Sequence, residues 1–151
     1  MMDLILWRHA EAEDGVPDIE RALTAKGIKQ AARMAKWLRR RLPDDALILA
    51  SPARRTRQTA QALTPDFKVV DEIGTRASPE DILHAAGWPH DDRTVVVVGH
   101  QPTLGATAAL LLAGRSEEWG IRKGAIIWLA HRDHDGGNRA QLRAALSPDL
   151  L

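Results

Sequence analysis

The 151-residue sequence contains no cysteine. Without thiols, the chain has no disulfide framework, no cysteine-ligated zinc or iron–sulfur cluster and no cysteine nucleophile. Tyrosine is also absent, which excludes a phenol as acid, base or phosphoacceptor. Neither charge predominates, since 21 Lys and Arg residues stand against 20 Asp and Glu residues. That balance argues against a generally basic nucleic-acid-binding surface, although it leaves room for a local cationic site.

Long apolar runs are missing as well. Asp3 and Arg8 flank an apolar stretch of four residues, which is too short for a secretory signal or a membrane span. We therefore expect a cytoplasmic protein with no membrane partner. With 44% hydrophobic and 27% charged residues, the composition is that of an ordinary globular protein. The length predicts a single domain over residues 1–151.

Short apolar runs alternate with helical patterns along the chain. The runs predict strands at 4–7, 47–50, 67–70, 94–98, 125–130 and 141–146. The helical patterns predict helices from 24 to 42, 52 to 63, 78 to 86 and 102 to 112. In the first helix we expect Thr24 as N-cap and an apolar stripe that begins at Ile28; in the second we expect Ser51 as N-cap.

This alternation predicts a three-layer α/β/α sandwich with a mainly parallel central sheet. The 94–98 strand is apolar throughout, as expected of a strand that is covered on both faces. Between the last two strands, the turn sequence Asp135-Gly136-Gly137-Asn138 predicts an antiparallel hairpin at the C-terminal edge of the sheet.

Cationic and imidazole side chains follow three of the predicted strands. Arg8 and His9 follow the first strand, and His100 follows the fourth. The second strand is followed by three arginines, at positions 54, 55 and 57. Ligands of open α/β sheets bind beyond the carboxyl ends of the strands, so these groups converge if the three strands are neighbours. Arginine in a first helical turn opposes the helix dipole, and a bound anion such as phosphate would correct this.

Four sequence blocks resemble the signatures of the histidine phosphatase (phosphoglycerate-mutase-like) superfamily. They are Arg8-His9-Ala10, residues 21–27, residues 51–59 and Gly99-His100. Their order, together with the short chain, is most similar to the phosphohistidine phosphatase SixA branch. Helical spacing alone leaves the choice among the three arginines open, and the resemblance selects Arg55. Ala10 replaces the usual glycine, which we expect to be tolerated unless the position needs a positive φ.

The resemblance implies a metal-independent phosphatase without a cofactor, acting through a phosphohistidine intermediate on phosphohistidine in a protein. His9 is the implied nucleophile, Arg8 and Arg55 bind the phosphoryl group, and His100 is the second histidine. Arg21 is a candidate substrate-binding residue, with a salt bridge at the start of the helix as the other interpretation. Four of the carboxylates between the second and fourth strands are available as a general acid, without a pattern that identifies one of them: Asp71, Glu72, Glu80 and Asp81.

Three alternatives remain open at this stage. A small-metabolite phosphomonoesterase, acting on a sugar or nucleotide phosphate, would use the same scaffold but needs a more enclosed pocket. A non-catalytic phosphopeptide-binding module would need only the arginines, not both histidines. A metallohydrolase would need clustered carboxylate ligands, which this sequence lacks. The segment from His131 to Asp135 contains His and Asp side chains, but its position in a predicted turn favours a solvated loop over a metal site.

Overall fold

The central element of the fold is a six-stranded sheet with the order β3-β2-β4-β1-β5-β6. The structure is a computed structural model that describes residues 1–132 and 139–151. The strands are β1 (Met2–Arg8), β2 (Leu47–Ala50), β3 (Lys68–Val69), β4 (Thr94–Gly99), β5 (Ile126–His131) and β6 (Gln141–Leu146). The first four are mutually parallel, while β5 pairs antiparallel with β1 and with β6.

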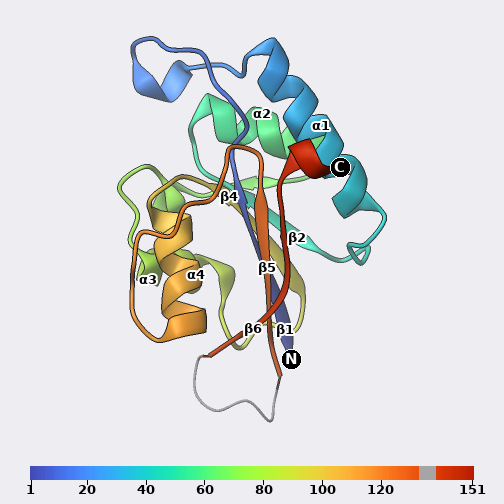
Figure 1. Ribbon diagram of the computed structural model, residues 1–151, viewed down its shortest axis with the longest axis vertical. Helices are drawn as coiled ribbons and strands as arrows, with labels where there is room; N and C mark the ends of the chain where they lie inside the picture. The colour runs from blue at the N-terminus through green and yellow to red at the C-terminus, as the bar shows by residue number, and fades with distance from the viewer. Residues whose placement is uncertain (133–138) are drawn as a thin grey trace.

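Helices cover both faces of this sheet. They are α1 (Ala25–Arg39), α2 (Arg54–Leu63), α3 (Pro79–Ala86) and α4 (Thr103–Ala113), with short 3-10 turns η1 (Asp18–Glu20), η2 (Asp71–Ile73) and η3 (Pro148–Leu150). Figure 1 shows the α1–α2 pair apart from the α3–α4 pair. The predicted three-layer sandwich with its antiparallel C-terminal edge is therefore confirmed. The predicted turn at 135–138 lies outside the described residues.

Alternation of side chains along β1 and β4 divides the core between the two faces. Leu4, Leu6 and Val97 pack in one cluster with residues of α3 and α4. Ile5, Trp7 and Val98, among others, pack in a second cluster with residues of α1 and α2. Both faces of β4 are thus covered, which explains why its sequence is apolar at every position.

Two details of the predicted helices are wrong. Ile28 is 56% exposed, because the buried side of α1 is formed by Ala31, Met34, Ala35 and Leu38. Ser51 is not the N-cap of α2, since that helix begins at Arg54 after Ala53. Ala53 is extended and precedes the helix, and the Ser51 hydroxyl lies 2.7 Å from Nε2 of His100 instead. Thr24 is confirmed as the N-cap of α1, because its hydroxyl accepts from the Gly27 amide.

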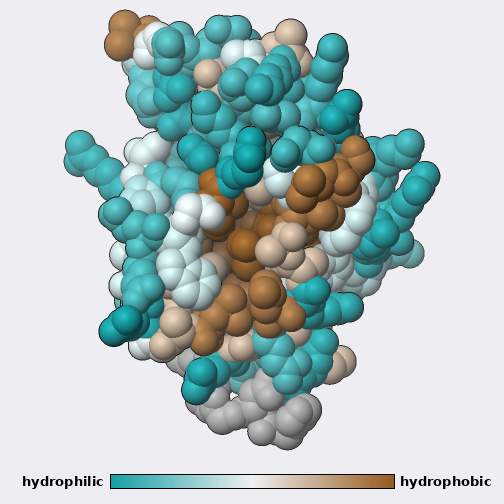
Figure 2. Space-filling model, viewed as in Figure 1, coloured by the Kyte–Doolittle hydropathy of each residue, from teal (hydrophilic) through white to brown (hydrophobic). Residues whose placement is uncertain are grey.

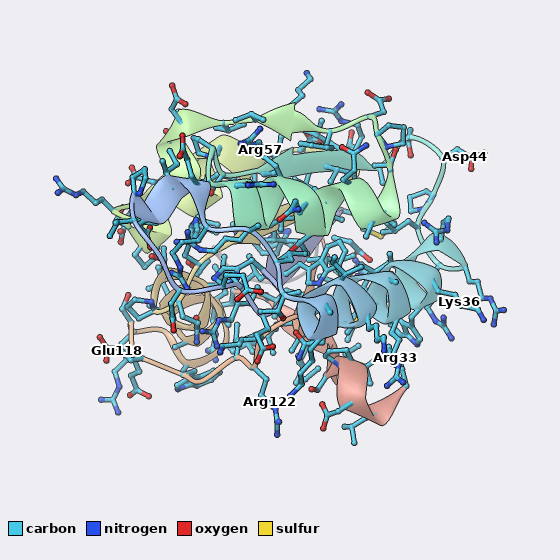
Figure 3. All side chains as sticks on the ribbon, turned by 90° about the horizontal axis from the view of Figure 1, so that it is seen from above. Arg33, Lys36, Asp44, Arg57, Glu118 and Arg122 are labelled. Atoms are coloured by element: carbon cyan, nitrogen blue, oxygen red, sulfur yellow. The ribbon has the colours of Figure 1, made fainter. Side chains whose placement is uncertain are left out.

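The surface matches the sequence patterns in most places. Arg33 and Lys36 of α1 point away from the body of the molecule, as expected of a solvated basic face (Figure 3). The face seen in Figure 1 has an apolar area over β5 and β6 (Figure 2). Leu142, a residue of β6, is 54% exposed. Among the described residues, no helix combines the length and apolar character needed to cross a membrane.

Gly27 lets α1 pack directly against the segment that follows β1. A Cβ at this position would lie 2.0 Å from the carbonyl oxygen of Glu11. The Thr24 amide donates to the same carbonyl, at 3.0 Å, so the carbonyl is held in place. The start of α1 therefore fixes the chain just beyond His9.

Gly27→Ala should lower the melting temperature even though alanine favours helices. Overpacking of this kind costs about 1–3 kcal/mol, more than the gain of roughly 1 kcal/mol from helix propensity. Calorimetry of Gly27→Ala and of Gly120→Ala, where a Cβ meets nothing within 4 Å, measures the difference. A Gly27→Ala protein as stable as the wild type would contradict this account of the packing.

Candidate active site

The carboxyl ends of β1, β4 and β2 meet at one end of the sheet, because β4 pairs with both of the others. Backbone bonds extend this pairing past the strands: the His9 amide donates to Gly99 at 3.1 Å, and the Ser51 amide donates to Val98 at 3.2 Å. The rings of His9 and His100 lie 5.4 Å apart between centroids. Figure 3 looks onto this end, with Arg57 and Arg122 on opposite sides of it.

His9 is held in a single neutral form. Its Nδ1 lies 2.7 Å from the carbonyl oxygen of Ala10, which can only accept, so Nδ1 carries the proton and Nε2 keeps the lone pair. Burial lowers the pKa of His9 to about 4; the bond to Ala10 opposes this shift, and the charges of Arg55 and Arg8 add to it. Ala10 does not have a positive φ, so the condition under which alanine would be disfavoured at this position is not met.

His100 is buried between a hydroxyl and a guanidinium. Its Nε2 lies 2.7 Å from the hydroxyl oxygen of Ser51, and its Nδ1 lies 3.5 Å from a terminal nitrogen of Arg55. Because a guanidinium only donates, this arrangement suits a neutral ring with its proton on Nε2. Burial, followed by the charges of His9 and Arg55, lowers the pKa of His100 to about 3.

Arg55 is the arginine that joins this cluster. It is 4% exposed, whereas Arg54 and Arg57 are exposed. Its two terminal nitrogens donate to the backbone carbonyl and the carboxylate of Asp18, at 2.9 and 3.0 Å. Its Nε–H is buried and has no hydrogen-bond partner within the described parts of the chain. The same holds for the Nε–H of Arg8, whose Nη1 donates to Ile121 at 2.8 Å.

One side of α2 carries Arg55 and also accepts hydrogen bonds from the backbone of neighbouring segments. Three and four residues further along, Gln58 accepts from the Leu23 amide at 2.7 Å and Thr59 accepts from the Ala10 amide at 3.1 Å. These positions share a helix face with Arg55 because of their spacing. The block at residues 51–59 therefore positions the His9 segment as well as supplying the arginine.

Asp18 is the residue of the site that the sequence patterns did not identify. Its carboxylate lies 3.0 Å from Arg21 and 3.0 Å from Arg55, and its side chain is 58% exposed. The three-residue spacing of Asp18 and Arg21 is the sequence signal that could have identified Asp18. The residues of η1 show no apolar periodicity, so no helical turn was predicted there. Arg21 forms its salt bridge to this residue and not at the start of α1, and its Nε donates to Glu13 at 2.7 Å.

Two of the four candidate carboxylates are engaged elsewhere. Asp81 closes the capping box of α3 with Ser78, and Glu72 lies 2.7 Å from His84. No group of three or more His, Asp or Glu side chains within residues 1–132 and 139–151 is arranged to hold a metal ion. Most of the polar segment 131–135 lies outside these residues.

Comparisons with known proteins identify the family. The model of the histidine phosphatase superfamily (branch 1) matches residues 4–77. The chain belongs to this superfamily. An uncharacterized protein of Mycobacterium tuberculosis is 35% identical over 108 residues, which cover 69% of this chain and 68% of that protein.

Solved structures with this fold are similar to this protein over nearly its whole length. A SixA protein of Agrobacterium tumefaciens, assigned as a phosphohistidine phosphatase, is 30% identical and covers 97% of each chain, with a TM-score of 0.78. A protein histidine phosphatase SixA in complex with tungstate has a TM-score of 0.84 at 22% identity and covers 99% of each chain, which shows the shared fold. The protein is thus a phosphatase of the SixA-like type.

Titration of the two histidines tests the electrostatics of the site. At pH 5 an ordinary imidazole, with a pKa near 6.5, is almost fully protonated. His9 and His100 should still be neutral there, because their pKa values are about 4 and about 3. NMR of the ring resonances between pH 7.5 and 5, assigned with His9→Gln and His100→Gln, measures this. Two rings that protonate near pH 6.5 without added anion would contradict it.

Proposed function

We propose that this phosphatase transfers the phosphoryl group of its substrate to His9 and then to water, without a metal ion. The observation that carries the proposal is the 2.7 Å bond from His9 to Ala10. It leaves the lone pair of the neutral ring on Nε2, the form in which imidazole attacks phosphorus. The lowered pKa of His9 keeps that form populated at neutral pH.

The reaction takes two displacements. In the first, Nε2 of His9 forms a bond to phosphorus as the bond to the leaving group breaks, and the bonding electrons depart with that group. In the second, water forms a bond to phosphorus while the P–N bond to His9 breaks. Inorganic phosphate is released, and the proton lost by water balances the one taken up by the leaving group.

The cations around His9 suit the charge of the phosphoryl group. Within residues 1–132 and 139–151, Arg8 and Arg55 each have a buried Nε–H without a partner, and a bound phosphoryl oxygen would satisfy these donors. Phosphoryl transfer depends mainly on positioning and on stabilising charge at the equatorial oxygens. A bound dianion would also raise the pKa of His100, so that its Nδ1 could donate to the same group. In this proposal Arg21 binds substrate at the rim.

We further propose that the substrate is phosphohistidine on a protein. None of the four candidate carboxylates is assigned to the site, and phosphohistidine needs no carboxylic acid to expel its leaving group. The likeness to SixA over nearly the whole chain supports the same substrate class. A small-metabolite phosphatase is the second candidate, because a polar cavity of about 550 Å³ lies beside Arg21, Arg54 and Arg57.

A turnover screen tests this substrate assignment. The wild-type protein would be offered a histidine-phosphorylated carrier protein, 4-nitrophenyl phosphate, phosphoserine and a panel of sugar and nucleotide phosphates. We expect kcat/KM for the phosphohistidine protein to exceed that for any alkyl phosphate by at least about a hundredfold, because a general acid contributes ~10²–10⁴-fold to alkoxide departure. An alkyl phosphate hydrolysed equally fast would instead support the metabolite phosphatase.

His9→Ala is the companion variant in that screen. It should lose turnover of every substrate and form no acid-labile phosphoenzyme, while its circular dichroism spectrum stays that of the wild type. Activity within about tenfold of wild type, less than about 1.4 kcal/mol of barrier, would rule out His9 as the nucleophile.

Arg55→Ala should reduce kcat/KM about a hundredfold or more, which is the usual effect of removing a charge-stabilising donor. Arg57→Ala is the matched control from the same helix, because Arg57 is exposed and its Nε donates to Pro52. Arg55→Lys should not restore activity, since an ammonium lacks the fork of donors. Equal losses in Arg55→Ala and Arg57→Ala would indicate a diffuse basic surface instead.

A further inference from the structure

We infer that Asp18 is a specificity-determining residue whose ionised carboxylate accepts a hydrogen bond from the ring N–H of a departing imidazole and so favours phosphoramidates over phosphate esters. The inference rests on the proposed function and names the group that selects the substrate class. It starts from the position of Asp18 at the open side of the site, bonded to Arg55 and 58% exposed, while His9 is 8% exposed.

Two guanidinium groups keep the Asp18 carboxylate charged. Arg21 and Arg55 donate to its two oxygens, each at 3.0 Å, and these bonds lower the pKa of Asp18. Arg8, His9 and His100 are the other titratable groups of the site, and both histidines are neutral at neutral pH. An ionised carboxylate has no proton to give, so Asp18 cannot serve as the general acid that an alkoxide requires.

Phosphohistidine presents the opposite requirement. When its ring is protonated on the nitrogen that does not bear phosphorus, that N–H is a donor and the ring is the better leaving group. A carboxylate beside the ring stabilises this cationic form, as an opposite charge raises the pKa of an imidazole. As Nε2 of His9 bonds to phosphorus, the P–N bond of the substrate breaks and its electrons return to the substrate ring. That ring leaves neutral, and the positive charge passes to the ring of His9.

Arg55 can hold Asp18 and a phosphoryl group together. The bonds to Asp18 come from its two terminal nitrogens, and among the described residues its Nε–H has no partner. A guanidinium carries five N–H donors, so phosphoryl binding does not have to displace the carboxylate. The substrate can therefore lie against Arg55 with Asp18 still in place at the side facing solvent.

The space next to Asp18 fits a small ring. A pocket of about 140 Å³ is lined by Asp18 and by residues that include Ile19, Pro52, Ala53 and Thr75. Ser51, which contacts His100, also lines it, so the pocket adjoins the buried cluster. Pockets for drug-sized molecules occupy about 300–1,000 Å³, and this one is too small for a nucleotide. Its apolar walls suit an imidazole better than a sugar with many hydroxyl groups.

The experiment compares two leaving groups in Asp18→Asn. Phosphoimidazole can offer a ring N–H to Asp18, whereas 4-nitrophenyl phosphate cannot. Asparagine keeps the size and an acceptor oxygen but loses the charge. We expect the ratio of kcat/KM for phosphoimidazole to that for 4-nitrophenyl phosphate to fall at least about tenfold, the difference between a charge-assisted and a neutral hydrogen bond. Turnover of the ester should rise, because a negative charge near its dianion has been removed.

Glu20→Gln is the matched control, since Glu20 lies in the same 3-10 turn and is exposed. It should leave the substrate ratio at the wild-type value. Melting temperatures of both variants check folding. Equal losses for the two substrates in Asp18→Asn would overturn the inference and make Asp18 a residue that only positions Arg55. A wild-type protein that hydrolyses esters but neither phosphoimidazole nor the phosphohistidine protein would overturn the proposed function itself, before any variant is measured.

Discussion

The pairing of β4 with β1 on one side and β2 on the other determines where the polar side chains of this protein meet. The carboxyl ends of neighbouring parallel strands lie at the same end of the sheet, so the residues after each strand are brought together. Backbone bonds from His9 to Gly99 and from Ser51 to Val98 continue the ladder beyond the strands. The two histidines therefore directly follow paired strands and do not lie in long loops. This placement favours a constant orientation of the histidines toward the phosphoryl group.

Placing two imidazoles and two guanidinium groups in one buried cluster has an electrostatic consequence. Burial and the neighbouring positive charges both disfavour protonation of His9 and His100. Burial and the cations together thus keep His9 neutral, as the proposed nucleophile must be, and the cations also attract an anion. Asp18 supplies a negative charge at the exposed side, where it pairs with Arg55. An anion in the site would satisfy the Nε–H donors of Arg8 and Arg55, which have no partner in the part of the chain that the structure describes.

Several residues of the four sequence blocks act by positioning others. Gly27 allows α1 to contact the backbone of Glu11. Gln58 accepts a hydrogen bond from the Leu23 amide, and Thr59 accepts one from the Ala10 amide. The block at residues 51–59 therefore holds neighbouring segments in place and also supplies one arginine of the site. This explains why an entire face of the short helix α2 contacts the site, although the helix supplies only one of its guanidinium groups.

The sequence by itself determined the layered fold and the strands that end in polar groups, and the resemblance of its blocks to a known family selected Arg55. Apolar periodicity and strand-end chemistry are local properties, so a single chain is enough to read them. Only the tertiary structure decided that Ser51 contacts His100 and that Asp18 joins Arg55 to Arg21. The contacts of Ser51 with His100 and of Asp18 with Arg55 link residues 49 and 37 positions apart. Such contacts depend on how α2 and η1 pack over the sheet edge, and no local pattern encodes that packing.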